Sequence, residues 1–97
     1  MFYGISKIVF EGHSVQNDKR DLHSLMEKIK KKFNASVKIP SDFKKTGSPT
    51  LMVAILENEE SSINRILDKI VDVCEDSGMG RVMSEKAMID FIDFEDQ

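Results

Sequence analysis

Two segments of the chain repeat their apolar residues at steps of three and four, and shorter apolar segments flank each of them. The repeating residues are Leu22, Leu25, Met26, Ile29 and Phe33 in the first segment, and Ile63, Ile66, Leu67, Ile70, Val71 and Cys74 in the second. This period places each set on one stripe of an amphipathic helix. A fold for this chain must therefore bury two helical stripes against the flanking segments.

Two of the flanking segments predict buried strands. Residues 2–10 are rich in aromatic and β-branched side chains on both faces, which suits a strand in the middle of a sheet. Residues 50–57 form a continuous apolar run, so this strand is also expected to be covered on both of its faces.

The other two flanking segments have weaker strand patterns. Residues 35–39 alternate apolar and polar side chains and are followed by Pro40, a pattern typical of a half-exposed edge strand. Residues 81–94 predict a last strand that is bulged around residues 84–86, and residues 95–97 predict a frayed tail.

Residues that favour caps mark the ends of the helices. The first helix is expected to start between Ser14 and Asp18 and to end at Asn34, which can adopt left-handed backbone. Asn58 predicts the N-cap of the second helix, and Gly78 predicts its end.

The order strand, helix, strand, strand, helix, strand is the split βαβ arrangement. Right-handed crossovers then put both helices on one face of a four-stranded antiparallel sheet, with the first and third strands in the middle. A chain of 97 residues has room for a single modest core. The sequence therefore predicts one α+β domain over residues 1–97, a ferredoxin-like two-layer sandwich.

Composition excludes several classes of protein. Charged residues make up 32% and hydrophobic residues 40% of the chain, as in ordinary soluble globular proteins. The longest apolar run, residues 51–56, is far too short to cross a bilayer, and no secretory leader pattern opens the chain. Because Cys74 is the only cysteine, no internal disulfide can form, which fits a reducing compartment. We therefore expect a cytoplasmic protein without membrane contact.

The residue pattern does not predict catalysis. His13 and Ser14 are adjacent and favour helix capping over a base and nucleophile pair. Cys74 lies on an apolar stripe beside acidic residues, so a buried and inert thiol is expected. His13 and His23 lack the spacing of metal ligands. The chain is therefore expected not to be an enzyme and to need no metal or cofactor.

Several short motifs point to one family. They are Met1-Phe2-Tyr3-Gly4-Ile5, His13-Ser14, Phe33-Asn34 with Ser36-Val37, Thr50-Leu51 with Val53-Ala54, and Leu67-Asp68-Lys69. Together they resemble the YlxP-like family of small uncharacterised bacterial proteins, over most of the chain up to about Val73. The resemblance implies a ferredoxin-like fold. It also implies a role near ribosomes or RNA, because genes of this family often lie among translation and ribosome-maturation genes.

Positive charge is concentrated in one part of the chain. Although the net charge is −3, nine of the fourteen basic residues lie between Lys19 and Lys45, against three acidic ones. Such asymmetry is typical of a surface that faces a polyanion, and RNA phosphates suit it. The alternative is a solvated helix face that keeps the protein soluble. The predicted basic rim consists of Lys19, Arg20, Lys28, Lys31, Lys32, Lys38, Lys44 and Lys45.

Apolar residues on both faces of the predicted sheet suggest a partner. A two-layer fold leaves one face of its sheet open to water, so we expect a homodimer through this face or through an edge strand. Two functions stay open. The first is a non-enzymatic binding protein associated with RNA or ribosome maturation through the basic rim. The second is a dimeric regulatory or scaffolding module that acts through its sheet, with or without a small-molecule ligand.

Overall fold

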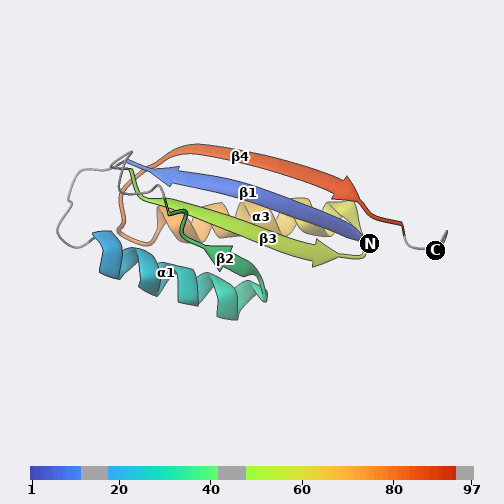
Figure 1. The fold of residues 1–97 in the computed structure, drawn as a ribbon, viewed down its shortest axis with the longest axis horizontal. Helices are drawn as coiled ribbons and strands as arrows, with labels where there is room; N and C mark the ends of the chain where they lie inside the picture. Colours follow the sequence, from blue (N-terminus) through green and yellow to red (C-terminus); the bar gives the residue numbers. More distant parts are fainter. Residues whose placement is uncertain (12–17, 42–47, 94–97) are drawn as a thin grey trace.

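Four strands and two helices make up the fold in a computed structural model that describes residues 1–11, 18–41 and 48–93. Along the chain they are β1 (Phe2–Phe10), α1 (Asp18–Phe33), β2 (Ser36–Lys38), β3 (Thr50–Glu57), α3 (Glu60–Glu75) and β4 (Val82–Phe91). The strands form one antiparallel sheet in the order β2-β3-β1-β4. Figure 1 shows α3 behind the long strands and α1 beside β2. The predicted α+β architecture, with the first and third strands in the middle, is confirmed.

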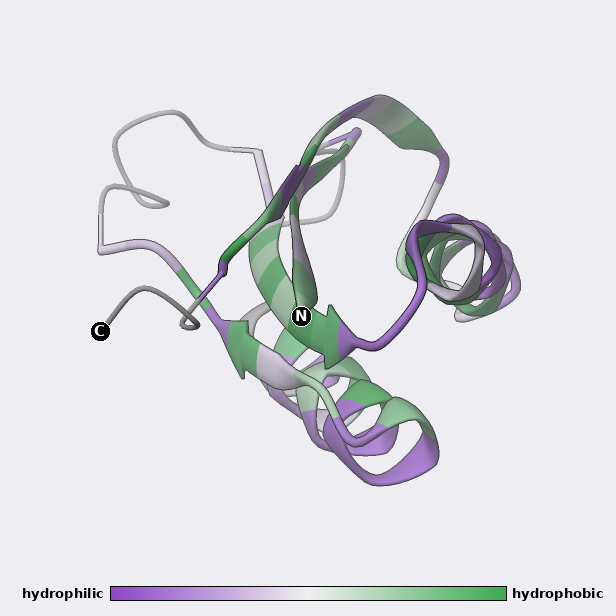
Figure 2. Ribbon diagram, turned by 90° about the vertical axis from the view of Figure 1, so that its right-hand side faces the viewer, coloured by the Kyte–Doolittle hydropathy of each residue, from purple (hydrophilic) through white to green (hydrophobic). Residues whose placement is uncertain are grey.

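Strand alternation divides the sheet into a face that packs on the helices and an open face. In β1, Gly4, Ile8 and Phe10 are buried, whereas Lys7 is exposed and Ile5 is half-buried. Directly paired residues of antiparallel strands point to the same face, so the register extends this division to β3 and β4. In Figure 2 the hydrophilic segments of both helices lie mainly on the sides turned away from the strands.

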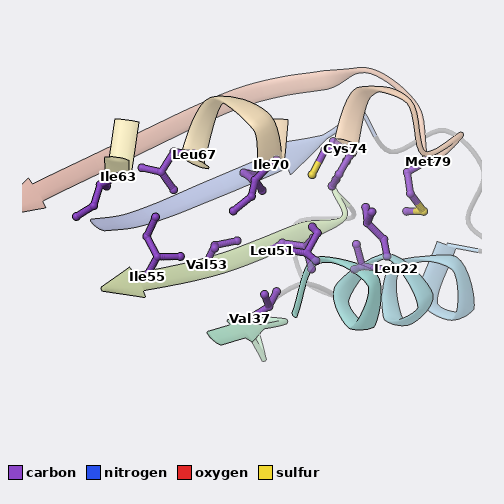
Figure 3. Packing of buried hydrophobic residues seen from close by; sticks show 14 residues of the cluster. Leu22, Val37, Leu51, Val53, Ile55, Ile63, Leu67, Ile70, Cys74 and Met79 are labelled. Atoms are coloured by element: carbon purple, nitrogen blue, oxygen red, sulfur yellow. The ribbon is translucent and has the colours of Figure 1, made fainter. Parts of the chain in front are cut away.

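One hydrophobic cluster unites both helices with the sheet. Its members are Ile8, Phe10, Leu22, Leu25, Ile29, Val37, Leu51, Val53, Ile55, Ile63, Leu67, Ile70, Cys74 and Met79. In Figure 3, Ile63, Leu67 and Ile70 reach from α3 toward the strands, and Leu22 reaches into the same cluster from α1. Because both helical stripes are buried in one cluster, the two helices cover the same face of the sheet, as predicted.

The helix α3 approaches β1 closely at Gly4. A Cβ atom added at this position would lie only 2.5 Å from Cγ2 of Ile63. Glycine removes this conflict because it has no side chain. The contact between α3 and the centre of the sheet therefore depends on the absence of a methyl group at residue 4.

The helix ends match the sequence predictions at three of four places where they can be compared. The helix α1 begins at Asp18, within the predicted range, and Asn34 follows it with a left-handed φ of 52°. After α3, Gly78 has a φ of 83°, as a helix-terminating glycine should. The predicted N-cap at Asn58 is wrong, because Glu59 occupies the N-cap position and makes no side-chain cap hydrogen bond.

The irregularity in β4 lies earlier than predicted. Val9 pairs with Ser84 and Phe10 pairs with Val82, which leaves Met83 as the extra residue. The predicted bulge in β4 is therefore present, but it lies directly before residues 84–86, each of which has a partner in β1. Their polar side chains belong to an edge strand that borders solvent, so polarity here does not signal a break in pairing. The predicted tail at residues 95–97 lies outside the described residues.

Candidate functional site

The face of the sheet turned away from the helices is open. On β3, Ala54 and Leu56 point to this face, and Leu56 is 65% exposed. On β4, Met88 is 53% exposed. The prediction that β3 is covered on both faces is therefore wrong for the single chain, because each helix packs on the same side of the sheet.

A row of lysines crosses this open face at right angles to the strands. Lys38 on β2 pairs with Met52 on β3, and Met52 pairs with Lys7 on β1. Lys7 in turn pairs with Lys86 on β4. Because directly paired residues point to one face, Lys38, Lys7 and Lys86 form what we call the lysine row. With strands about 4.8 Å apart, the row spans roughly 14 Å between its outer backbone positions.

The lysine row carries positive charge that the described part of the chain does not neutralise. Lys7, Lys38 and Lys86 are all exposed, and none of them forms an ion pair with another described residue. Like charges directly opposite each other destabilise a sheet, so the Lys7 and Lys86 pair is locally unfavourable. An anionic ligand on this face would relieve the repulsion.

A hollow of about 360 Å³ lies beside the lysine row, where β2 begins at Ser36. Its lining consists of Tyr3, Ile5, Asn34, Ser36, Ala54, Ile55 and Leu56. The strand β2 pairs with β3 only over Ser36–Lys38, whereas β3 continues to Glu57, so the sheet is narrower at this end. We call this feature the β2 hollow. It combines one aromatic ring, an aliphatic floor and two uncharged polar side chains.

The structure places the predicted basic rim on two different faces. Lys28, Lys31 and Lys32 are exposed on α1, in the helical layer. Lys38 points to the open face of the sheet, since its neighbour Val37 is buried against the helices. Lys38 therefore lies in a row with Lys7 and Lys86 instead of continuing the surface of α1.

The other members of the rim are only partly described. Lys19 and Arg20 belong to the first turn of α1, but their side chains lie outside the described part of the structure. Lys44 and Lys45 lie outside the described residues altogether, as do the candidate capping residues His13 and Ser14.

Sequence reasoning missed Lys7 and Lys86, which lie far from the basic segment along the chain. The signal for Lys7 is its position in β1, where a charge interrupts the apolar open-face residues Tyr3, Ile5 and Val9. Lys86 becomes visible as part of the same site only once its pairing with Lys7 is known.

The described residues show an inert thiol and no evident metal centre. Cys74 is fully buried, and burial together with the negative charge of Glu75 raises the pKa of its thiol to about 12. The predicted burial of Cys74 is confirmed. In the described ranges, no group of three or more His, Cys, Asp or Glu side chains is arranged to hold a metal ion. Neither α1 nor α3 is long and apolar enough to cross a lipid bilayer.

Burial of Cys74 predicts slow thiol chemistry and a loss of stability at high pH. The thiol should react with Ellman's reagent only as fast as the protein opens, and at full rate in denaturant, because the thiolate is the reactive form. The folded pKa of about 12 exceeds the ordinary thiol value of 9.0, so above pH 9 the folded state retains a proton that the unfolded state loses. This contribution to stability is therefore complete below pH 9 and is lost as the pH rises toward 12.

Denaturation of wild type and Cys74→Ala at several pH values isolates this effect. The difference in unfolding free energy between the two proteins should decrease above pH 9, because only wild type has a thiol whose contribution is lost there. Rapid labelling of the native thiol, or a constant difference between the two proteins, would contradict the buried position of Cys74.

The chain matches a solved structure in fold and a family model in sequence. A solved structure titled "De novo designed protein Foldit4" has a TM-score of 0.59 and 12% sequence identity, over 96% of this chain and 100% of the designed one. At that identity the likeness shows the fold alone. No curated protein matches the sequence. The model of a family described as "Protein of unknown function (DUF503)" matches residues 6–87, and the chain belongs to this family.

Proposed function

We propose that the chain is a non-enzymatic RNA-binding protein that holds single-stranded RNA on the open face of its sheet. The observation that carries this proposal is the lysine row, in which three exposed lysines from three strands share one line. Lysines that contact backbone phosphates release counterions and give binding that weakens with salt. The row offers such contacts on a surface that is otherwise largely apolar.

The surroundings of the row favour a single strand as the ligand. Four-stranded sheets of RNA-recognition modules stack unpaired bases on aromatic side chains of the open face. Tyr3 is an aromatic residue on this face, since it pairs with the exposed residues Leu56 and Asp90. The resemblance to YlxP-like proteins supports the same partner, because it implies a role near ribosomes.

A homodimer through the same face is the second candidate, and the exposed side chains of Leu56 and Met88 favour it. Charge argues against it. In a two-fold symmetric dimer the same patch lies on both sides of the interface, so an axis that passes close to the lysine row would bring two such rows together. An anionic partner compensates these charges, whereas a second copy in that arrangement adds to them.

A comparison of two charge-reversed double variants tests the proposal. Lys7→Glu with Lys86→Glu reverses two members of the lysine row, and Lys28→Glu with Lys31→Glu makes the same charge change on α1. The measurement is fluorescence anisotropy of a labelled uridine hexamer at several salt concentrations. Three phosphate contacts predict a slope of log affinity against log salt of about −2 for wild type. The sheet variant should bind at least about tenfold more weakly, and the α1 variant should stay close to wild type.

The alternatives give different results in the same experiment. If only the α1 variant loses affinity for the hexamer, the phosphate contacts lie at Lys28 and Lys31 and not on the sheet. If wild type does not bind the hexamer, RNA binding on this face is contradicted. Sedimentation velocity without RNA tests the second candidate, a homodimer through the open face. A dimer at micromolar concentration that Leu56→Glu converts to monomer would favour the scaffolding function.

A further inference from the structure

We infer that the β2 hollow is a nucleobase site, in which a base stacks on Tyr3 while its phosphate backbone meets the lysine row. This inference rests on the proposed function and deepens it. The lysine row alone would bind any polyanion, whereas the β2 hollow would make the site selective for polyanions that carry bases.

The lining of the hollow has the chemistry that a base requires. A base has flat apolar faces and polar edges, so proteins bind unpaired bases by aromatic stacking and by hydrogen bonds to the edges. Tyr3 supplies the ring, and Ile5, Ala54 and Leu56 supply apolar surface. A volume of about 360 Å³ lies within the usual range of ligand pockets.

Two polar side chains at the hollow are available for the edge of a base. The amide of Asn34 both donates and accepts hydrogen bonds, and so does the hydroxyl of Ser36. Within the described part of the chain, neither side chain has a hydrogen-bond partner. Asn34 lies where α1 passes into β2, and its backbone there is left-handed, with φ of 52°.

The hollow and the lysine row are close enough to share one short strand of RNA. Ser36 and Lys38 are two residues apart on β2 and point to the same face, as do Ile5 and Lys7 on β1. At about 3.4 Å per residue, each pair is separated by roughly 6.8 Å along its strand. A base in the hollow therefore leaves its backbone within reach of Lys38 and Lys7, whose side chains are long and exposed.

Tyr3 is a built-in reporter for this site. The chain has one tyrosine and no tryptophan, so its intrinsic fluorescence comes from Tyr3. Titration with a uridine hexamer should quench this emission as the base stacks, after correction with free N-acetyltyrosinamide for absorbance by the RNA. Inorganic polyphosphate, which has the charge but no bases, should bind in a salt-dependent way without comparable quenching.

Substitutions at the hollow separate stacking from charge. Tyr3→Leu keeps an apolar side chain and should weaken hexamer binding by roughly ten- to a hundredfold, the effect of one lost stacked base. Tyr3→Phe keeps the ring and should restore affinity close to that of wild type. Asn34→Gly suits the left-handed backbone and removes the amide, so it should weaken the hexamer without loss of thermal stability. All three variants should bind polyphosphate as wild type does.

The outcomes distinguish this inference from the function on which it rests. If the hexamer binds but Tyr3 emission is unchanged and Tyr3→Leu binds equally well, the hollow is not a base site and RNA is held by charge alone. If neither the hexamer nor polyphosphate binds, the proposed function fails with it. Quenching of Tyr3 emission in wild type supports both, together with a hexamer affinity that Tyr3→Leu lowers and Tyr3→Phe keeps close to that of wild type.

Discussion

Replacement of Phe10 by alanine is expected to lower the free energy of unfolding by about 3–5 kcal/mol. The side chain of Phe10 is fully buried in the cluster that both helices share. Its removal loses the transfer free energy of the ring and leaves a cavity, because close-packed surroundings relax only in part. A small domain has a total stability of about 5–15 kcal/mol, so the variant should retain little of it. Urea denaturation followed by circular dichroism measures the difference.

Phe91→Ala is the matched control, since it makes the same chemical change at a side chain that is 51% exposed. The ring of Phe91 packs edge to face on Phe2, with centroids 5.0 Å apart. Loss of such an aromatic pair costs about 1 kcal/mol. Equal losses for the two substitutions would contradict the position of the core.

Replacement of Gly4 by alanine is expected to lower the free energy of unfolding by about 1–3 kcal/mol. In most strands this substitution is neutral or favourable, because glycine gives the unfolded chain extra freedom. Here the new Cβ atom would lie 2.5 Å from Cγ2 of Ile63, a branch methyl close to the backbone of α3. The helix must therefore shift away from β1 or the side chain must leave its rotamer. Chemical denaturation of the single variant gives the size of the effect.

A double-mutant cycle tests whether Ile63 causes this loss. Ile63→Leu keeps the side-chain volume and removes the Cγ2 branch that approaches Gly4. In the Ile63→Leu background, Gly4→Ala should cost clearly less than in wild type, because residues in contact show non-additive effects. Strict additivity would mean that Ile63 does not limit the approach of α3.

The element order and the sheet topology were predictable because local patterns determine them here. Helical and strand periodicities have different apolar spacings, and the right-handed crossover rule leaves few ways to connect these elements. The end of α1 at Asn34 and the burial of Cys74 follow from local residue preferences in the same way. Packing details such as the close approach at Gly4 do not follow, because they depend on which turn of α3 lies above β1.

Some local features could not be predicted correctly from the sequence because tertiary context decides them. Ser6 is buried on the helix-facing side of β1, where the pattern favours an apolar residue, and its hydroxyl donates a hydrogen bond to Glu85 at 2.7 Å. Glu85 is exposed on an edge strand, so the pair lies where the core meets solvent. Likewise, Asn58 has a favourable side chain for capping, yet the chain enters α3 one residue later.

The candidate site was less predictable than the fold. The distribution of charge along the chain predicted one surface for Lys28, Lys31, Lys32 and Lys38. In the structure the first three lie on α1, whereas Lys38 lies on the open face of the sheet. The lysine row depends on strand pairing, which joins Lys7 to Lys86 from opposite ends of the chain. Strand register is a property of the assembled sheet, so it cannot be inferred from the positions of the basic residues along the chain.

The most direct test of RNA binding on the open face is chemical-shift mapping of the ¹⁵N-labelled protein with an unlabelled uridine hexamer. The lysine row and the β2 hollow predict that the largest backbone amide shifts occur at Tyr3, Ile5, Lys7, Lys38 and Lys86. Shifts along the outer side of α1 should be small by comparison. Shifts centred on Lys28, Lys31 and Lys32, with the amides of β1 and β4 unchanged, would contradict binding on the sheet.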